Sequence, residues 1–176
     1  MAIVAFLRGA NVGGHRRFRP SLVAKQLQRF DVVNIGATGL FVVRNPGSGQ
    51  TFRLELVRRL PFDTQVVLCE GTDVLALESC SPSQRITMDK DHVRFVSILA
   101  EPVPDRLPAM PFGIPSDDDW YVRILGRKNE FVFGVYRRHM KTISYLGKID
   151  KALGAQVTTR NWNTIEAVLK VLKLGA

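Results

Sequence analysis

The sequence is poor in cysteine and has no long apolar run. Two cysteines, Cys69 and Cys80, occur in 176 residues, and no export signal precedes them. We therefore expect reduced thiols and a cytoplasmic location. The longest apolar runs, near residues 2–7 and 96–100, are far shorter than the roughly 18 residues that span a bilayer, so we expect no membrane association.

Histidine is also scarce. His15, His92 and His139 lie far apart in the sequence, and none has a His or Cys partner at the spacing of metal ligands. This pattern predicts no structural zinc and no other metal site. Nothing else in the sequence calls for a cofactor, so none is expected.

Acidic residues are outnumbered by basic ones, and the two kinds are unevenly distributed. The formal net charge is +9; residues 1–60 carry 10 Lys and Arg against 2 Asp and Glu, and residues 131–176 carry 8 against 2. Residues 61–130 carry 7 against 12 and are acidic. One interpretation is a basic face for a polyanion such as nucleic acid. The other is a composition bias with solvated side chains.

Residues 158–164, which we call the C-terminal motif, read Thr-Thr-Arg-Asn-Trp-Asn-Thr. Apolar residues recur at helical spacing from Trp162 onward, which predicts a helix with Asn163 as N-cap and Glu166 completing a capping box. A cation, polar side chains and helix N–H groups together favour an anionic ligand. The candidate ligand-binding residues of this motif are Thr159, Arg160, Asn161, Trp162 and Asn163.

A purely structural role for the C-terminal motif is the alternative. Arg160 would then hydrogen-bond carbonyl groups near the chain's beginning, with Trp162 packed over it.

Residues 8–14, the glycine loop, hold three glycines between a predicted strand at 2–7 and a helix that begins at Pro20. The order of strand, glycine loop and helix is similar to a phosphate cradle, and His15, Arg16, Arg17 and Arg19 add charge. The spacing fits neither a Walker loop nor a dinucleotide fingerprint, and a simple tight turn is the alternative. The candidate ligand-binding residues here are Arg8, Gly9, Asn11, Gly13 and Gly14.

The pattern of apolar residues predicts an α+β protein. Strands at 2–7, 32–37, 40–44 and 65–69, with helices from Pro20 and at 51–60, give the split βαβ order. A polar junction follows at 81–84. The split βαβ order is then repeated without its first helix, by strands at 93–100, 120–125 and 131–136, a helix at 143–153 and a strand at Val157. We therefore predict two tandem ferredoxin-like halves with antiparallel sheets, residues 1–90 and 91–176, the second degraded.

Four segments are similar to an uncharacterised bacterial family, domain of unknown function 1697. They are Leu7-Arg8-Gly9-Ala10-Asn11-Val12-Gly13-Gly14, Thr38-Gly39-Leu40-Phe41-Val42-Val43, Leu153-Gly154 and the C-terminal motif. The family usually has Asn where Leu40 stands, and a Ser-Lys pair where Met140 precedes Lys141. The resemblance implies two ferredoxin-like halves and brings no assigned activity.

Two functional classes follow. A binding module for nucleic acid or another polyphosphate suits the basic ends, but the third strand, residues 39–43, lacks the spaced aromatics of RNA-recognition domains. A small-molecule enzyme or sensor would place Arg8, Asn11, Lys141, Arg160 and Asn161 around an anionic metabolite. These residues include no nucleophile or general base, so the catalytic residues are unknown.

Overall fold

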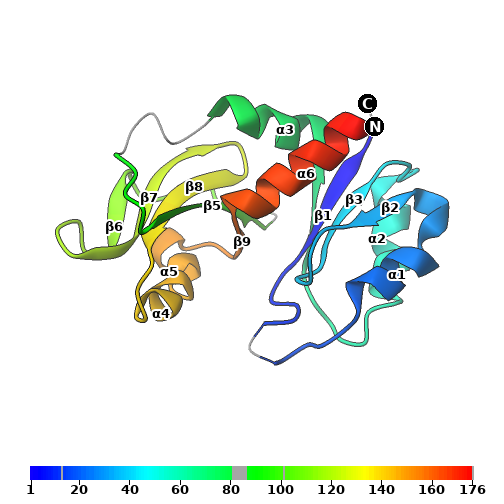
Figure 1. Ribbon diagram of the computed structural model, residues 1–176, viewed down its shortest axis with the longest axis horizontal. Helices are drawn as coiled ribbons and strands as arrows, with labels where there is room; N and C mark the ends of the chain where they lie inside the picture. Colours follow the sequence, from blue (N-terminus) through cyan, green and yellow to red (C-terminus); the bar gives the residue numbers. More distant parts are fainter. Residues whose placement is uncertain (13, 81–86, 101, 176) are drawn as a thin grey trace. The chain divides into compact units, whose positions relative to one another are not determined.

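The computed structural model describes residues 1–12, 14–80, 87–100 and 102–175, and the chain forms two compact units (Figure 1). Unit 1 contains Met1–Cys80 and Glu166–Ala176, and unit 2 contains Ser81–Ile165. Each unit has an antiparallel sheet, so the predicted α+β class is confirmed. Gly13 and the predicted junction at 81–84 lie outside the described residues.

The division differs from the predicted halves because most of the last helix, α6 (Trp162–Leu174), belongs to unit 1. The Lys173 ammonium lies 2.6 Å from a Glu78 carboxylate oxygen. A Cβ on Gly71 would stand 3.2 Å from the Leu172 side chain. These contacts with residues 71–78 group the end of the chain with its beginning, which a boundary at residue 90 did not anticipate.

Unit 1 has a four-stranded sheet in the order β2-β3-β1-β4, and every neighbouring pair is antiparallel. Its elements are β1 (Ile3–Leu7), α1 (Pro20–Gln26), η1 (Gln28–Phe30), β2 (Val32–Asn34), β3 (Leu40–Val43), α2 (Gly49–Val57), β4 (Val66–Glu70), α3 (Gly71–Leu75) and η2 (Ala76–Cys80).

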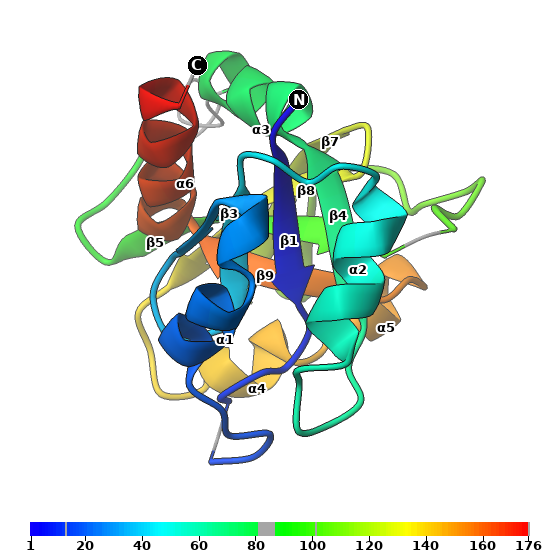
Figure 2. The ribbon, with the colours of Figure 1, turned by 90° about the vertical axis from the view of Figure 1, so that its right-hand side faces the viewer.

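Strand β1 in the sheet of unit 1 is buried on both faces, as its continuous apolar run at residues 2–7 predicts. All five residues of β1 are buried. Figure 2 shows α1 and α2 over one face, where Ile3, Ala5 and Leu7 share a core with Phe52 and Leu56. Burial of these side chains supplies the main free energy that stabilises the unit.

Two details of the helices correct the predicted pattern. Helical spacing predicts Leu22 and Val23 on the buried stripe of the first helix, and Leu56 and Val57 on that of the second. Val23 and Leu56 are buried, but Leu22 and Val57 are 46% and 41% exposed. Helix α2 begins at Gly49, before the predicted residue 51, because the Ser48 side chain accepts a hydrogen bond from the Thr51 amide and caps it.

Unit 2 has a five-stranded sheet in the order β6-β7-β8-β5-β9. Its elements are β5 (His92–Leu99), β6 (Phe112–Pro115), β7 (Trp120–Lys128), β8 (Phe131–Arg137), α4 (Thr142–Leu146), α5 (Ile149–Leu153) and β9 (Val157–Asn161). Strands β5, β7, β8 and β9 have the same relative order as β1, β2, β3 and β4. Between β5 and β7 the described residues form edge strand β6 and no helix, in agreement with the predicted order, in which the first helix of this half is missing.

The helix predicted at residues 143–153 is two short helices, α4 and α5, separated at Gly147 and Lys148. Glycine in a helix interior is unfavourable, and the chain bends there. The second helix ends at Gly154 in the left-handed conformation, as predicted.

The chain has no helix, in the part that the structure describes, with the length and apolar character needed to cross a membrane.

Gly134 tests the packing of unit 2. It is paired with Phe95, and a Cβ on Gly134 would collide with the buried Phe95 ring and lie 2.8 Å from the Arg123 carbonyl oxygen. We expect Gly134→Ala to lower the free energy of unfolding by about 3 kcal/mol or more, measured by urea unfolding followed by Trp fluorescence. Gly147→Ala, whose Cβ would meet nothing closer than 3.6 Å, is the control and should be nearly neutral. Equal losses in both variants would contradict this account.

Candidate functional site

The glycine loop follows β1 and is held in a defined turn. Asn11 has a positive φ of 53°, and its backbone N–H donates a hydrogen bond to the Arg16 carbonyl at 3.2 Å. Val12 and His15 form an isolated β-bridge inside this turn. The loop is therefore a small hairpin and not an open connector.

The side chain of Asn11 links three parts of unit 1. Its Nδ2 donates to the Ala37 carbonyl at 2.6 Å and to the Phe18 carbonyl at 3.1 Å. Its Oδ1 accepts a hydrogen bond from the Phe18 amide at 2.9 Å. Both amide hydrogens are thus used within the protein, so Asn11 positions the loop and offers a ligand at most one lone pair.

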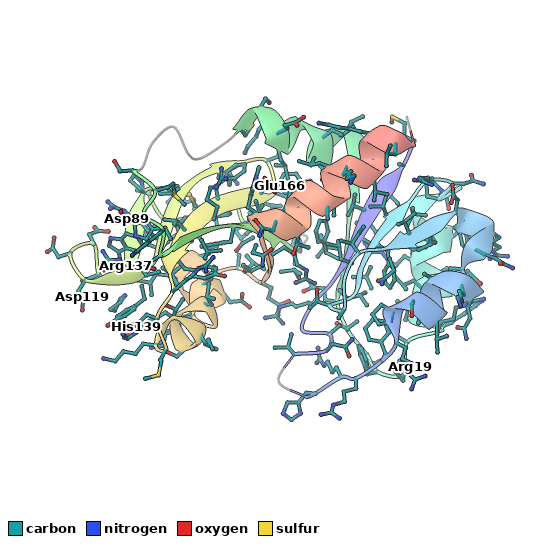
Figure 3. All side chains as sticks on the ribbon, viewed as in Figure 1. Arg19, Asp89, Asp119, Arg137, His139 and Glu166 are labelled. Atoms are coloured by element: carbon teal, nitrogen blue, oxygen red, sulfur yellow. The ribbon has the colours of Figure 1, made fainter. Side chains whose placement is uncertain are left out.

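A hollow of about 560 Å³ opens beside this turn. We call it the loop hollow. Two exposed cations, Arg17 and Arg19, line it together with the half-buried ring of Phe18. The remaining lining residues are Asn11, Gly14 and Ala37, so no carboxylate lines it in the described part of the chain. Figure 3 labels Arg19 on the segment that leads into α1.

Glycine at position 14 leaves room for one of these cations. Gly14 has a φ of +78°, and a Cβ there would lie 3.2 Å from Nη2 of Arg17. An L side chain would therefore be strained and would also crowd the guanidinium.

Two other predicted residues of the loop, Arg8 and Gly9, lie apart from the loop hollow. The Arg8 carbonyl accepts hydrogen bonds from the Thr64 hydroxyl at 2.6 Å and from Arg16 Nη1 at 3.4 Å. Gly9 has a φ of +66° and turns the chain. Neither lines the hollow, whereas Arg17 and Arg19, which the sequence marked only as added charge, do.

The C-terminal motif lies in unit 2 at the junction of β9 and α6. Its first four residues extend the strand, which corrects the expectation that the motif mainly starts a helix. Asn161 is the capping residue: its Oδ1 accepts hydrogen bonds from the Thr164 amide at 3.0 Å and the Thr164 hydroxyl at 2.7 Å. Asn163 is exposed in the first turn of the helix and is not the N-cap, because the helix begins one residue before it.

Three side chains of the motif take part in internal contacts. The Thr159 hydroxyl lies 2.7 Å from that of Ser97, which is fully buried in β5. Arg160 Nη1 donates to the Thr159 carbonyl at 2.8 Å, and burial lowers the pKa of Arg160 to about 10. Trp162 is 7% exposed, with the Arg94 guanidinium 5.6 Å from its ring centre.

Lys141 stands just before α4. Its backbone N–H donates to Nδ1 of His139 at 3.2 Å, and its side chain is exposed. No hydrogen bond or ion pair joins it to residues 159–163 in the described part of unit 2. These predicted site residues therefore occupy two separate places in that unit.

The described residues contain no group of three or more His, Cys, Asp or Glu side chains placed to hold a metal ion.

Comparison with known proteins shows a likeness of fold. No family model matches the chain, and no curated protein matches it. The chain is similar to the solved structure of a conserved bacterial protein from Streptococcus pneumoniae, with a TM-score of 0.59 and 15% sequence identity over 97% of this chain and 98% of that one. At this identity the similarity concerns the fold alone.

Replacing Asn11 tests its role in the loop. We expect Asn11→Ala to destabilise unit 1 by about 2 to 4 kcal/mol, because three hydrogen bonds are lost and alanine is strained at a positive φ. Asn11→Gly should cost about 1 kcal/mol less, since glycine adopts this conformation freely.

The measurement must report on unit 1. Both tryptophans, Trp120 and Trp162, lie in unit 2, so hydrogen exchange of the β1 amides is the suitable probe. If both variants retain the exchange protection of the wild type, Asn11 does not organise the loop.

The Ser97–Thr159 pair separates a structural role of Thr159 from ligand binding. We expect Ser97→Ala and Thr159→Val each to destabilise unit 2 by about 1 to 2 kcal/mol, since each leaves the other hydroxyl, buried in Ser97 and half-buried in Thr159, without this partner. The double variant should lose clearly less than the sum of the two. Urea unfolding followed by Trp fluorescence measures the cycle, and additive losses would show that the hydroxyls do not depend on each other.

Proposed function

We propose that the loop hollow of unit 1 binds an anionic, phosphate-bearing ligand, and that nucleic acid is favoured over a small metabolite. The observation that carries this proposal is the composition of the hollow: two exposed guanidinium groups and an aromatic ring, with no carboxylate among its described lining residues. Arginine stays charged at physiological pH and presents paired donors that match phosphate oxygens.

Phe18 is the second element of the proposal. Its ring packs edge-on against Phe62 with the ring centres 5.6 Å apart, and the residue remains partly exposed. A supported, half-exposed ring next to guanidinium groups suits a nucleobase beside its phosphate.

The surroundings also favour a polyanion. Three arginines surround the Glu55 carboxylate in this unit. Guanidinium nitrogens of Arg29, Arg58 and Arg59 lie 3.2, 3.2 and 2.8 Å from its oxygens. The hydrogen bond from Arg59 and the charges of the three arginines lower the pKa of Glu55, while its partial burial acts in the opposite direction. Three cations around one anion leave this part of unit 1 positive, which would attract nucleic acid from a distance.

We also infer that each unit is a ferredoxin-like module. The supporting observations are the β-α-β-β-α-β order of unit 1 and the shared strand order of the two sheets. RNA-recognition domains of this class stack bases on an exposed sheet face. In unit 1 the residues of β1 and β3 are buried, which directs the proposed binding to the loop instead.

Three further expectations stay predictions: the resemblance to domain of unknown function 1697, the cytoplasmic location, and a contribution of Arg8, Gly9 and the C-terminal motif to ligand binding. No catalytic residue is proposed.

The test is fluorescence anisotropy with short labelled single- and double-stranded RNA and DNA, from low to physiological salt. Arg17→Ala/Arg19→Ala should weaken binding about tenfold or more and reduce the slope of log K against log salt by about 1 to 2. Lys25→Ala/Lys170→Ala removes the same charge from exposed positions of unit 1 outside the loop hollow and is the control. Equal weakening in both double variants would contradict a site at the hollow and indicate diffuse attraction.

A small metabolite is the other outcome. If nucleic acid binding vanishes at physiological salt, while nucleoside phosphates raise the melting temperature of the wild type but not of Arg17→Ala/Arg19→Ala, the ligand is a metabolite. If neither class acts on the wild type, the proposed function is wrong.

A further inference from the structure

A second cavity, of about 460 Å³, lies within unit 2. We call it the unit 2 cavity. Charged side chains of both signs line it: the carboxylates of Asp89, Asp91 and Asp119, and the guanidinium groups of Arg137 and Arg138. Figure 3 shows Asp89, Asp119, Arg137 and His139 gathered at one end of this unit. Its volume is within the range of about 300 to 1,000 Å³ that small-molecule sites usually have.

The opposite charges of the unit 2 cavity do not pair with one another. Among the described residues, no ion pair and no side-chain hydrogen bond joins any of the three aspartates to either arginine. Glu55 in unit 1 behaves differently, because three arginines close on its carboxylate. The cavity therefore keeps both signs of charge apart and available to a ligand.

The ring of Trp120 supports the guanidinium group of Arg137. Its guanidinium lies 4.1 Å from the centre of the Trp120 ring, and Trp120 is only 6% exposed. One face of the guanidinium is thus covered, while its N–H edge remains able to donate. A pre-positioned donor of this kind loses little entropy when it binds a carboxylate.

Two imidazoles add N–H donors. Nδ1 of His92 accepts a hydrogen bond from the Asp89 amide at 3.3 Å, and Nδ1 of His139 accepts one from the Lys141 amide at 3.2 Å. A nitrogen that accepts carries no proton, so in the neutral ring the proton is on Nε2. Both residues line the cavity, and the neutral form of each ring has an Nε2–H donor.

An aromatic row supplies an apolar surface. The ring of Tyr121, which lines the cavity, is stacked on Tyr145 with centres 5.0 Å apart and an interplanar angle of 3°. The ring centres of His139 and Tyr121 lie 5.0 Å apart. Such a row suits the aliphatic part of a small polar molecule.

We propose that the unit 2 cavity binds a basic α-amino acid. Its described lining has three carboxylates against two guanidiniums, so its best complement is a ligand with one carboxylate and two cationic groups. Arg137 and Arg138 bind the carboxylate, the aspartates bind the ammonium and the side-chain cation, and Tyr121 packs along the stem. A phosphate dianion would face an excess of negative charge here, in contrast to the loop hollow.

The experiment is an NMR titration of the full ¹⁵N-labelled chain with L-arginine and L-lysine. We expect saturable shifts of amides around Asp119, Tyr121 and His139. Three compounds should bind at least about tenfold more weakly: L-glutamate, inorganic phosphate and agmatine. L-glutamate and phosphate are anions that the carboxylates of the cavity repel. Agmatine lacks the carboxylate and loses its charged hydrogen bonds to the arginines. Shifts that do not saturate with either amino acid, or equal binding of phosphate or glutamate, would overturn the proposal.

Variants with matched controls locate the site. Asp119→Asn and Arg138→Gln should each weaken L-arginine binding about tenfold. Asp118→Asn in the same exposed turn and Arg127→Gln at the other end of β7 make the same charge changes outside the cavity, and should leave binding unchanged. The spectra also show whether each variant is folded. Equal effects in the variants and their controls would overturn the assignment.

This inference is independent of the proposed function. Arg17→Ala/Arg19→Ala in unit 1 should leave the affinity for L-arginine unchanged, and a loss of affinity in that variant would place the amino acid in the loop hollow and refute the site in unit 2.

Discussion

The burial of β1 on both faces is the constraint on which unit 1 depends. This strand pairs with β3 on one side and β4 on the other, and all of its side chains are removed from water. Its hydrophobic burial orients α1 and α2 over the sheet and leaves no exposed sheet face in the middle of the unit. Polar chemistry must then lie where the strands end, which is where the glycine loop begins.

The loop shows how a rigid sheet determines the position of a polar site. The end of β1 starts the turn, and Asn11 holds it to Ala37, in the segment between β2 and β3. The guanidinium groups of Arg17 and Arg19 are thereby carried by a turn with fixed hydrogen bonds. Pre-organisation of this kind lowers the entropic cost of binding an anion.

Unit 2 has a related arrangement with a different balance of charge. Its central strand β5 pairs with β8 and β9, and His92 at its start faces Arg137 in the register of β8. The cavity at this end combines both signs of charge, whereas the loop hollow of unit 1 has cations alone. Two sites of different electrostatic character in one chain are expected to select different ligands.

Periodicity and turn residues in the sequence determined most of the secondary structure. Apolar runs predicted the strands, Pro20 the start of α1, and Gly154 the end of α5, because these depend on local sterics and on burial patterns. The helix at 143–153 was predicted as one piece, and the start of the last helix was assigned to Asn163 in place of Asn161. In both cases neighbouring residues decided the boundary: the break falls at Gly147 and Lys148, and the Asn161 side chain caps the last helix through Thr164.

The sequence also indicated that the glycine loop and the C-terminal motif have unusual composition, and it named Asn11, Arg160 and Trp162. Only the tertiary structure decided what these side chains do, because a hydrogen bond such as that of Asn11 with Ala37 joins residues 26 positions apart. The unit 2 cavity was not predicted at all. Its lining residues come from three stretches, 89–92, 119–121 and 137–139, that lie far apart along the chain, and pairing of β5, β7 and β8 brings these stretches together.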